Sequence, residues 1–248
     1  MEQTLVLVSR FNLPHPIWAG RSAEDYRTWL DWRIELFRRL TVQSVRNCYD
    51  KPDRWLIMVD TREHDFLDEL TASVTGLPVT IVPYTGRDLP SSIRHTLSDL
   101  GFPRRILTCR LDTDDLVNTG FFKRLRSTKI TSAEARAGTV ISYPGGAIYD
   151  CLGDAFYFDN YFNNPFLCYV EEVDRSEDLR TVFCAQHIDL IDQSAHVKFL
   201  RSFTPFWAST IHDKNLANQS LQNSMQISFK NKRKLKRQFG IAPRGRDA

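Results

Sequence analysis

The sequence predicts an α/β fold with a mixed central sheet, in which a parallel half is followed by a half of mixed strand direction. In residues 1–115, short apolar runs alternate with amphipathic helical patterns, which is typical of parallel strands joined by helices. From residue 138 onward, strand patterns follow one another across tight turns, which favours antiparallel pairing. Between these parts, one apolar strand runs directly into three carboxylates.

The composition fits a globular chain that can bury a large core. The 248 residues are 42% hydrophobic and 12% aromatic. No apolar run reaches the roughly 18 residues of a membrane-spanning helix, and we expect no signal peptide, because the first residues enter a strand pattern without a basic leader. The five cysteines are scattered without CxxC spacing, so we expect free thiols and a cytoplasmic location.

The parallel half is predicted element by element. Leu5 to Val8 form a short buried strand. Ser22 and Asp25 have the spacing of a capping box, which opens a helix with an apolar face to about Leu40. The following elements are a strand at 55–59, a helix near 64–73, a strand at 79–83, a helix from Pro90 to a stop at Gly101, and a strand from 106.

The second half has shorter strands. Residues 138–143 and 147–151 are predicted as strands around a Pro-Gly-Gly turn, and 181–185 as a strand that ends near His187. An aromatic stretch lies between them, and we interpret it as core, with a sugar-stacking acceptor platform as the alternative. Its members are Phe156, Tyr157, Phe158, Tyr161, Phe162, Phe166 and Tyr169.

Three carboxylates, Asp112, Asp114 and Asp115, follow the strand that starts at 106. The carboxyl end of a parallel strand is where such sheets bind ligands. Neighbouring carboxylates repel one another unless a cation or a basic partner neutralises them. Mg²⁺ or Mn²⁺, bound together with phosphate oxygens, meets that need. A solvated acidic turn that caps a helix beginning near Asn118 is the alternative, and the spacing does not decide between them.

Other strand ends should lie at the same edge of the sheet. Ser9, Arg10 and Phe11 follow the first strand and Asp60 follows the second, so we expect them to line a nucleoside pocket. Arg110, beside the acidic cluster, is expected to bind phosphate or to pair with a neighbouring aspartate. The sequence contains neither GxGxxG nor GxxxxGK[ST], which argues against a dinucleotide enzyme and a P-loop.

The C-terminal segment is strongly basic. Residues 230–248 hold eight basic residues and one acidic residue, a net charge of +7 in a chain of net charge +3, so the rest carries about −4. We predict one domain over 1–225 and a basic tail over 226–248. The tail either attaches the protein peripherally to an anionic inner membrane face or is a solubilising extension. No nucleic-acid-binding signature is present, so we expect no nucleic acid partner.

The chain resembles nucleotide-sugar glycosyltransferases of the GT-A type and, more narrowly, a bacterial family of rhamnosyltransferases. This resemblance implies a GT-A-like, Rossmann-like nucleotide-binding half over 1–115 and an acceptor half over 116–225. The matching segments span most of the chain to about residue 218. They are RIELFRRLTVQSVRNCYDKPDRWLIMVD (33–60), CRLDTDD (109–115), NPFLCYVEE (164–172), RTVFCAQH (180–187) and FWASTIHDKNLAN (206–218).

The resemblance also implies site residues. The donor diphosphate would be held through Mn²⁺ or Mg²⁺, and a late histidine often completes the metal or phosphate shell of such enzymes. Without the resemblance, His212 would be interpreted as a surface histidine after a strand. The implied metal ligands are Asp112, Asp114, Asp115 and His212. The nucleotide-binding residues expected from the strand ends and the resemblance together are Ser9, Arg10, Phe11, Asp60, Arg110 and Asp112.

These expectations describe a metal-dependent transfer of a sugar from a nucleoside diphosphate to a hydroxyl of a glycan or a lipid-linked acceptor. The ion would stabilise the departing diphosphate. An inverting enzyme also needs a base, for which His187 is the first candidate and Glu171, Glu172, Asp150 and Asp154 are alternatives.

Two other functions stay open at this point. One is a metal-dependent nucleotidyltransferase, although Ser9-Arg10-Phe11-Asn12 is not the Gly-rich basic loop that such enzymes usually carry. The other is a non-catalytic protein that binds nucleotide-sugars.

Overall fold

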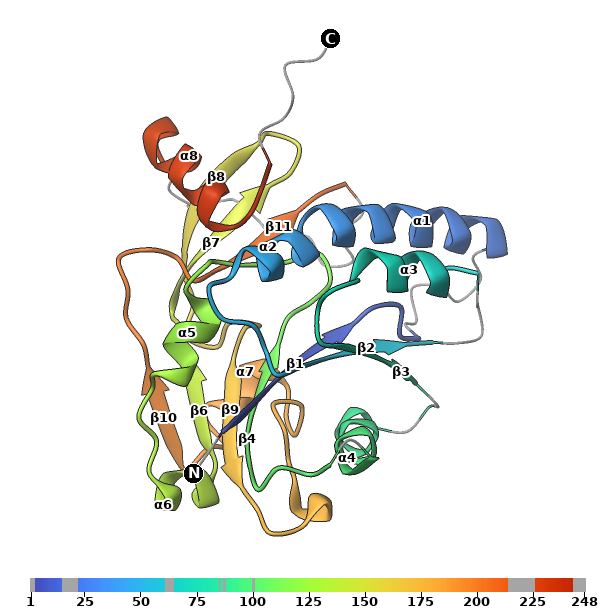
Figure 1. The fold of residues 1–248 in the computed structure, drawn as a ribbon. Coiled ribbons are helices and arrows are strands. Elements are labelled where there is room, and N and C mark those ends of the chain that lie inside the picture. The colour runs from blue at the N-terminus through green and yellow to red at the C-terminus, as the bar shows by residue number, and fades with distance from the viewer. Residues whose placement is uncertain are drawn as a thin grey trace.

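The computed structural model describes residues 3–14, 22–60, 65–84, 86, 88–99, 101–213 and 226–242. It contains a seven-stranded sheet in the order β10-β6-β9-β4-β1-β2-β3 and a four-stranded sheet in the order β5-β11-β7-β8. The predicted α/β class with a mixed central sheet is confirmed (Figure 1).

The parallel half forms one side of the large sheet. Its strands are β1 (Thr4–Arg10), β2 (Arg54–Val59), β3 (Val79–Pro83) and β4 (Arg105–Arg110), all paired in parallel. Helices α1 (Ala23–Arg39), α2 (Thr41–Asn47) and α3 (Leu67–Ser73) cover one face, and α4 (Leu89–Asp99) covers the other (Figure 1). The predicted capping box is present, since the Ser22 side chain accepts a hydrogen bond from the Asp25 amide at 3.1 Å.

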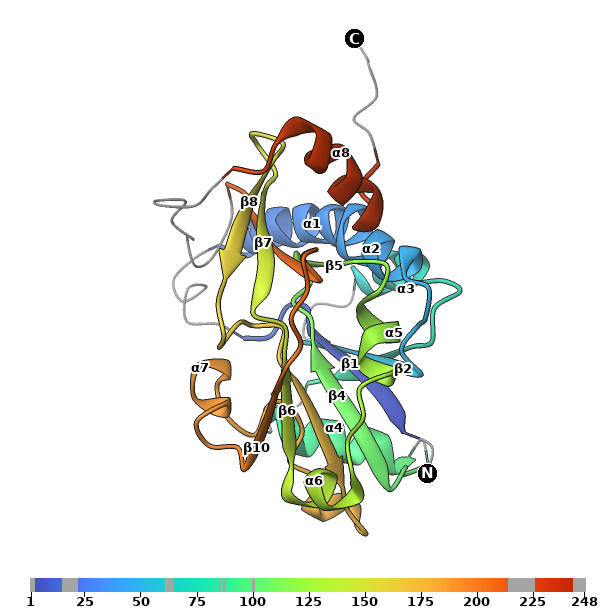
Figure 2. The same ribbon diagram turned by 90° about the vertical axis from the view of Figure 1, so that its left-hand side faces the viewer.

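The other side of the large sheet is mixed because β9 (Cys168–Glu172) runs antiparallel to both of its neighbours, β4 and β6 (Thr139–Ser142). β10 (His196–Phe199) then pairs in parallel with β6. The small sheet consists of the hairpin β7 (Gly145–Asp150) and β8 (Ala155–Asn160), followed by β11 (Trp207–Ile211) and β5 (Leu116–Val117). Figure 2 shows this sheet beside α1.

The predicted strand at 181–185 is wrong. These residues form turns, and the short helix α7 (His187–Leu190) follows them. Two backbone amides of the segment 180–181 donate to the Glu171 carboxylate at 2.8 Å, and the Val182 amide donates to Thr108 Oγ1 at 2.8 Å. Because side chains satisfy the backbone here, Thr181 and Val182 are buried without pairing in a sheet.

The aromatic stretch divides into two groups. Phe156, Phe166 and Tyr169 are buried, as the core interpretation predicts. Phe158 and Phe162 are 47% and 48% exposed, and Tyr161 is similar. β8 is an edge strand of the small sheet. Phe156 near its start is buried, and Phe158 further along is exposed.

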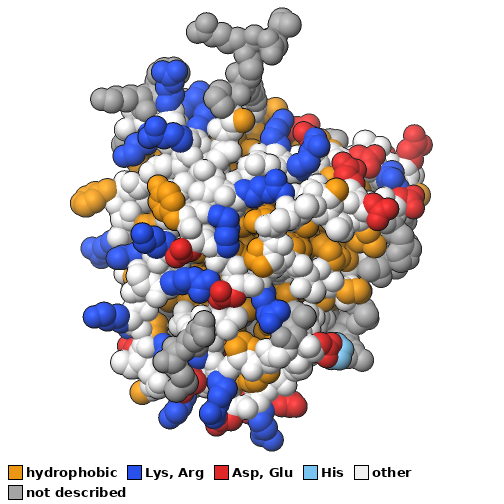
Figure 3. All heavy atoms as spheres, in the orientation of Figure 1, with side chains coloured by type: hydrophobic (Ala, Val, Ile, Leu, Met, Phe, Trp, Pro, Cys, Tyr) orange, Lys and Arg blue, Asp and Glu red, His pale blue; other side chains and the backbone are white. Residues whose placement is uncertain are grey.

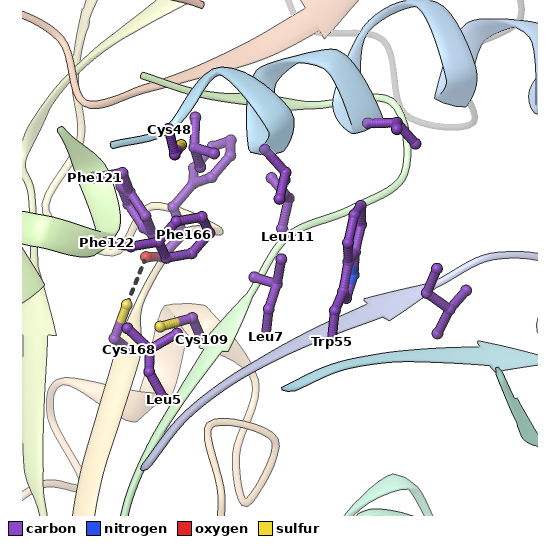
Figure 4. Packing of buried hydrophobic residues seen from close by; sticks show 14 of the residues in the cluster. Leu5, Leu7, Cys48, Trp55, Cys109, Leu111, Phe121, Phe122, Phe166 and Cys168 are labelled. Atoms are coloured by element: carbon purple, nitrogen blue, oxygen red, sulfur yellow. Dashed lines mark hydrogen bonds between the residues drawn. The ribbon is translucent and has the colours of Figure 1, made fainter. Parts of the chain in front are cut away.

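The main core lies between the large sheet and helices α1–α3. Leu5, Leu7 and Trp55 point from the sheet toward this layer, and Phe121, Phe122 and Phe166 close it on the other side (Figure 4). All five cysteines are free, and four of them are buried. Within the described residues, no helix combines the length and the apolar character required to cross a bilayer.

The basic C-terminal segment packs on the body as far as Ile241. Helix α8 (Phe229–Gln238) follows Ile227, and the side chains of Ile227, Leu235 and Phe239 are buried in a cluster that includes Phe156. The amide of Ile227 donates to the Phe156 carbonyl at 2.8 Å. Residues 243–248 of the predicted tail lie outside the described residues.

Candidate functional site

The acidic cluster lies at the carboxyl edge of the large sheet, in the turn between β4 and β5. The Leu111 amide donates to the Val8 carbonyl of β1 at 3.1 Å, and the Asp115 amide donates to the Asp112 carbonyl at 3.1 Å. The end of β11 reaches the same turn, because Thr210 Oγ1 donates to the Asp114 carbonyl at 2.8 Å. Strands from both sheets therefore position these carboxylates.

Asp112 lies between two arginines from neighbouring strand ends. Arg10 Nη2 is 3.1 Å from both of its carboxylate oxygens, and Arg110 Nη2 is 2.7 Å from Oδ2. Burial alone would raise the pKa of Asp112, but the positive charges of Arg110 and Arg10 hold it well below its ordinary value. Asp112 is therefore a carboxylate shared by two guanidinium groups.

Asp114 faces a different pair of groups. Its Oδ2 atom is 3.3 Å from His212 Nε2 and 3.6 Å from Arg33 Nη1. Burial acts to raise the pKa of Asp114, while Arg33 and His212 lower it, and the net direction is downward. The imidazole of His212 is buried and lies edge-on to Trp32, with ring centroids 4.5 Å apart.

Asp115 is buried, and among the described residues no basic side chain forms an ion pair with it. Its Oδ1 atom accepts a hydrogen bond from the Thr210 amide at 2.9 Å. Burial, followed by the charges of Asp114 and Asp112, raises the pKa of Asp115 well above its ordinary value. The turn is therefore buried rather than solvated. The strand β5 separates the cluster from the helix Phe121–Arg126, whose N-cap is Gly120, so these carboxylates do not cap that helix.

Arg33 supports the cluster from α1, and the sequence did not predict this role. It is 9% exposed. Its Nε donates to the Phe11 carbonyl at 2.9 Å and its Nη2 to Thr113 Oγ1 at 2.7 Å, while the guanidinium lies 5.2 Å from the Trp29 ring centre. An arginine within the apolar face of an amphipathic helix was the signal that could have identified it.

The structure does not bring every predicted nucleotide-binding residue to the edge. Ser9 is fully buried and accepts a hydrogen bond from Trp55 Nε1 at 2.9 Å. The Phe11 ring packs against Phe37 and Phe66 in the core. Their side chains therefore pack in the interior, and the nucleotide-binding role predicted for both residues stays a prediction. Asp60 is also buried, and the role predicted for it stays a prediction.

Asn12, another residue that sequence reasoning missed, links the ends of β1 and β2. Its side chain accepts from the Asp60 amide at 2.8 Å and donates to the Asp60 carbonyl at 3.1 Å. The same side-chain nitrogen donates to the Tyr26 hydroxyl at 3.2 Å. Asn12 thereby fixes the backbone at Asp60 relative to the end of β1.

His187 is a base candidate with electrostatic neighbours in the cluster. It is half-buried at the start of α7. Burial lowers its pKa, and the charge of Arg110 lowers it further, while Asp112 acts in the opposite direction. The other candidates have structural partners: backbone amides at Glu171 and Asp150, Arg136 at Glu172, and Lys232 and Lys236 at Asp154.

Some of the carboxylate and imidazole groups of the cluster have a spacing that fits a divalent ion. Among the residues that the structure describes, no three histidine, cysteine or acidic side chains are grouped as metal ligands. Asp114 Oδ2 and His212 Nε2, however, are 3.3 Å apart. Adjacent ligands of one octahedral ion with bonds of about 2.1 Å are roughly 3 Å apart. Asp114 and His212 therefore fit as two ligands, while Asp112 is engaged by arginines.

A family model described as "Putative rhamnosyl transferase" matches residues 4–224 of the chain. None of the curated proteins compared with the chain matches it.

Three solved structures show weak similarity to most of the chain. The inositol-1-phosphate CTP transferase from T. maritima is 11% identical, with 98% of both chains covered and a TM-score of 0.43. A putative nucleotide-diphospho-sugar transferase from Desulfovibrio desulfuricans G20 is 11% identical, with 94% of both chains covered and a TM-score of 0.40. HddC from Yersinia pseudotuberculosis is 9% identical, with 82% of this chain and 91% of that chain covered and a TM-score of 0.40. Similarities at this level carry no functional argument.

Proposed function

This chain belongs to the family of putative rhamnosyl transferases, a family of nucleotide-sugar transferases, and from that membership we propose that it is a GT-A type glycosyltransferase. It moves a sugar from a nucleoside-diphosphate donor to a hydroxyl group of a glycan or a lipid-linked acceptor. The nucleotide is bound at the carboxyl edge of the large sheet, where the acidic cluster lies.

The observation that carries this proposal is the pair of arginines on Asp112. Two guanidinium groups from neighbouring strand ends converge on one carboxylate, with distances of 2.7 to 3.1 Å. Guanidinium groups bind phosphate with the same paired geometry that they use for carboxylate. The two arginines carry one more positive charge than Asp112 neutralises. A diphosphate bound there would meet this excess charge and two guanidinium groups already held in position.

Asp114 and His212 are proposed to hold the divalent ion, Mn²⁺ or Mg²⁺, on the other side of the cluster. Both are anchored, because Thr210 is hydrogen-bonded to the cluster at two points and Arg33 lies against Asp114. When bound, such an ion supplies Lewis-acid stabilisation of the departing diphosphate.

His187 is proposed as the base that accepts the proton of the acceptor hydroxyl. Its lowered pKa keeps the imidazole neutral near neutral pH, which is the form that can accept a proton. Burial is the main cause of the lowered pKa, and the charge of Arg110, which also binds the donor, adds to it. This role applies to an inverting reaction.

Titration calorimetry with UDP, dTDP and GDP, with and without Mn²⁺, tests the binding part of the proposal. We expect Mn²⁺ to strengthen the affinity for at least one nucleotide. Asp114→Asn and His212→Gln should each remove that dependence, while Asp31→Asn, an exposed aspartate on α1, should preserve it. A Mn²⁺ effect of the same size in all three variants would contradict the assignment.

Product analysis separates the three candidate activities. A glycosyltransferase releases nucleoside diphosphate from a nucleotide-sugar, whereas a nucleotidyltransferase releases pyrophosphate from a nucleoside triphosphate and a sugar phosphate. A binding protein releases neither. We expect slow release of nucleoside diphosphate even with water as the acceptor.

A further inference from the structure

Three segments that are far apart in the sequence carry positive charge and contain no acidic residue. They are residues 121–131, 198–206 and 227–242. The first contains helix α5 (Phe121–Arg126), the second joins β10 to β11, and the third contains α8. Because none of the 30 acidic residues of the chain falls within them, each of the three segments is itself positively charged.

Backbone contacts hold these segments side by side. The Thr119 amide donates to the Gln238 carbonyl at 2.9 Å, which joins the start of α5 to the end of α8. Asn118 joins the same region to the second segment, since its side chain donates to the Pro205 carbonyl at 2.6 Å and its amide donates to the Phe206 carbonyl at 3.0 Å. The three segments therefore adjoin one another, and we refer to their exposed surface as one face.

Nine of the twelve basic residues in these segments fall into two groups. Arg126, Lys198, Lys232 and Lys236 form ion pairs with Asp53, Glu134 and Asp154. Five others are exposed, and none of them makes an ion pair within the part of the chain that the structure describes: Lys123, Arg124, Arg201, Lys234 and Arg237.

Aromatic side chains project from the same face. Phe203 is fully exposed, and Phe158 is 47% exposed. Together with Lys234 they line a hollow of about 110 Å³ beside α8. The buried side chains of Ile227 and Leu235 also line it. Figure 3 shows hydrophobic side chains on the left edge of the molecule with basic side chains above and below them. Figure 2 brings this side to the front, with β8 and α8 above β10.

We propose that this basic aromatic face, defined by Phe158, Phe203, Lys123, Arg124, Arg201, Lys234 and Arg237, docks the protein onto an anionic lipid bilayer. Basic side chains bind the anionic headgroups, and Phe203 enters the interface below them. A single-stranded nucleic acid is the alternative ligand for such a face. A projecting, fully exposed phenylalanine such as Phe203 fits insertion into a bilayer better than stacking on a nucleobase. The proposal does not depend on the function proposed above.

The face differs from the basic tail that the sequence indicated. Two tail lysines, Lys232 and Lys236, are held by Asp154, so they position α8 rather than contact lipid. Arg201 and the aromatic residues lie outside the tail and would be missed by a truncation of residues 226–248.

Vesicle co-sedimentation of the full chain tests the proposal with matched variants. The probes are vesicles of phosphatidylcholine alone and of phosphatidylcholine mixed with phosphatidylglycerol, at low and high NaCl. Arg201→Glu with Lys234→Glu removes two cations of the face, and Arg104→Glu with Arg175→Glu makes the same charge change elsewhere. Phe203→Ser is matched by Leu152→Ser, since Leu152 is 68% exposed.

The expected result is binding to the phosphatidylglycerol vesicles that weakens with salt. The Arg201/Lys234 variant should lose roughly 25-fold or more in partition coefficient, because each cation contributes about five-fold. Phe203→Ser should lose roughly ten-fold, and both control variants should bind like the unaltered chain.

Two results would overturn the proposal. One is equal binding by the face variants and their controls. The other is a charge effect that single-stranded RNA reproduces while Phe203→Ser has no effect on vesicle binding, because that pattern belongs to a polyanion site without insertion. The altered side chains are exposed, so the variants should fold, which their thermal unfolding verifies.

Discussion

The acidic cluster and the basic aromatic face both concentrate charge, and they differ in whether that charge is paired within the chain. At the cluster, Asp112 and Asp114 have basic partners within 4 Å, and these groups are largely buried. On the face, five exposed cations have no acidic partner among the described residues. Pairing fixes the position of the buried groups, whereas the unpaired cations can respond to an external anion.

The comparison predicts that loss of a buried member of the cluster has the largest effect. Arg33→Leu leaves the Phe11 carbonyl, Thr113 Oγ1 and the Asp114 carboxylate without their donor. We expect the free energy of unfolding to fall by about 3–5 kcal/mol. Urea denaturation measures it. Arg27→Leu on the same helix, which removes an exposed arginine, should leave the denaturation midpoint nearly unchanged, and equal losses in both variants would break the comparison.

The next effect concerns ligand affinity. Arg110→Gln removes the guanidinium that is 2.7 Å from Asp112 and should weaken nucleoside-diphosphate binding roughly 10- to 100-fold, since charge-assisted hydrogen bonds contribute about 1.5–3 kcal/mol. Titration calorimetry measures the change. Arg175→Gln, an exposed arginine outside the cluster, is the control. If both variants retain full affinity, the paired arginines do not bind the donor.

A smaller effect is expected at Asp154, whose carboxylate joins the small sheet to α8 through Lys232 and Lys236. Burial alone would raise the pKa of Asp154, but hydrogen bonds from Lys236, Tyr149 and Lys232 lower it to about 2. The folded-state pKa is below the ordinary value of 3.8, so the stabilisation is present above about pH 4 and is lost as the pH falls through about 2.

Asp154→Asn should therefore lower the free energy of unfolding by about 1–2 kcal/mol at neutral pH, with the difference disappearing near pH 2. Asparagine also tolerates the φ of +49° at this position. Urea unfolding over a pH series measures the difference. A difference that is constant with pH would mean that the carboxylate charge is not its cause.

The smallest effect is expected for the unpaired cations. Lys123→Gln and Arg201→Gln should each change the free energy of unfolding by less than about 0.5 kcal/mol, because neither side chain has a partner to lose among the described residues. Thermal unfolding of the two variants checks this. A larger loss would show that the face contributes to folding and would weaken its contrast with the cluster.

Local patterns predicted the parallel half well because each element there is decided by nearby residues. The capping box at Ser22, the apolar face of α1 and the strand that leads into Asp112 are all visible within short windows. The position of the acidic cluster at the sheet edge follows from the parallel direction of β1 and β4.

The remaining features depend on long-range partners, which local patterns do not show. The segment 181–185 has a strand-like composition, but Glu171 and Thr108 bind its backbone from other strands. His212 meets Asp114 across 98 residues, and only the resemblance to a family indicated their proximity. The docking of α8 depends on Asp154, an exposed-looking turn residue in the sequence.

Trp32 on α1 connects the two regions, because it contacts His212 and also packs against the cluster of Leu36, Leu40, Leu235 and Phe239 that holds α8. A helix rises about 1.5 Å per residue, so the site and the α8 contact lie roughly one to two turns apart on one rigid rod. If membrane binding at α8 shifts α1, the two binding events are coupled. Thermodynamic reciprocity then requires that donor binding change the membrane affinity by the same factor by which the membrane changes the donor affinity.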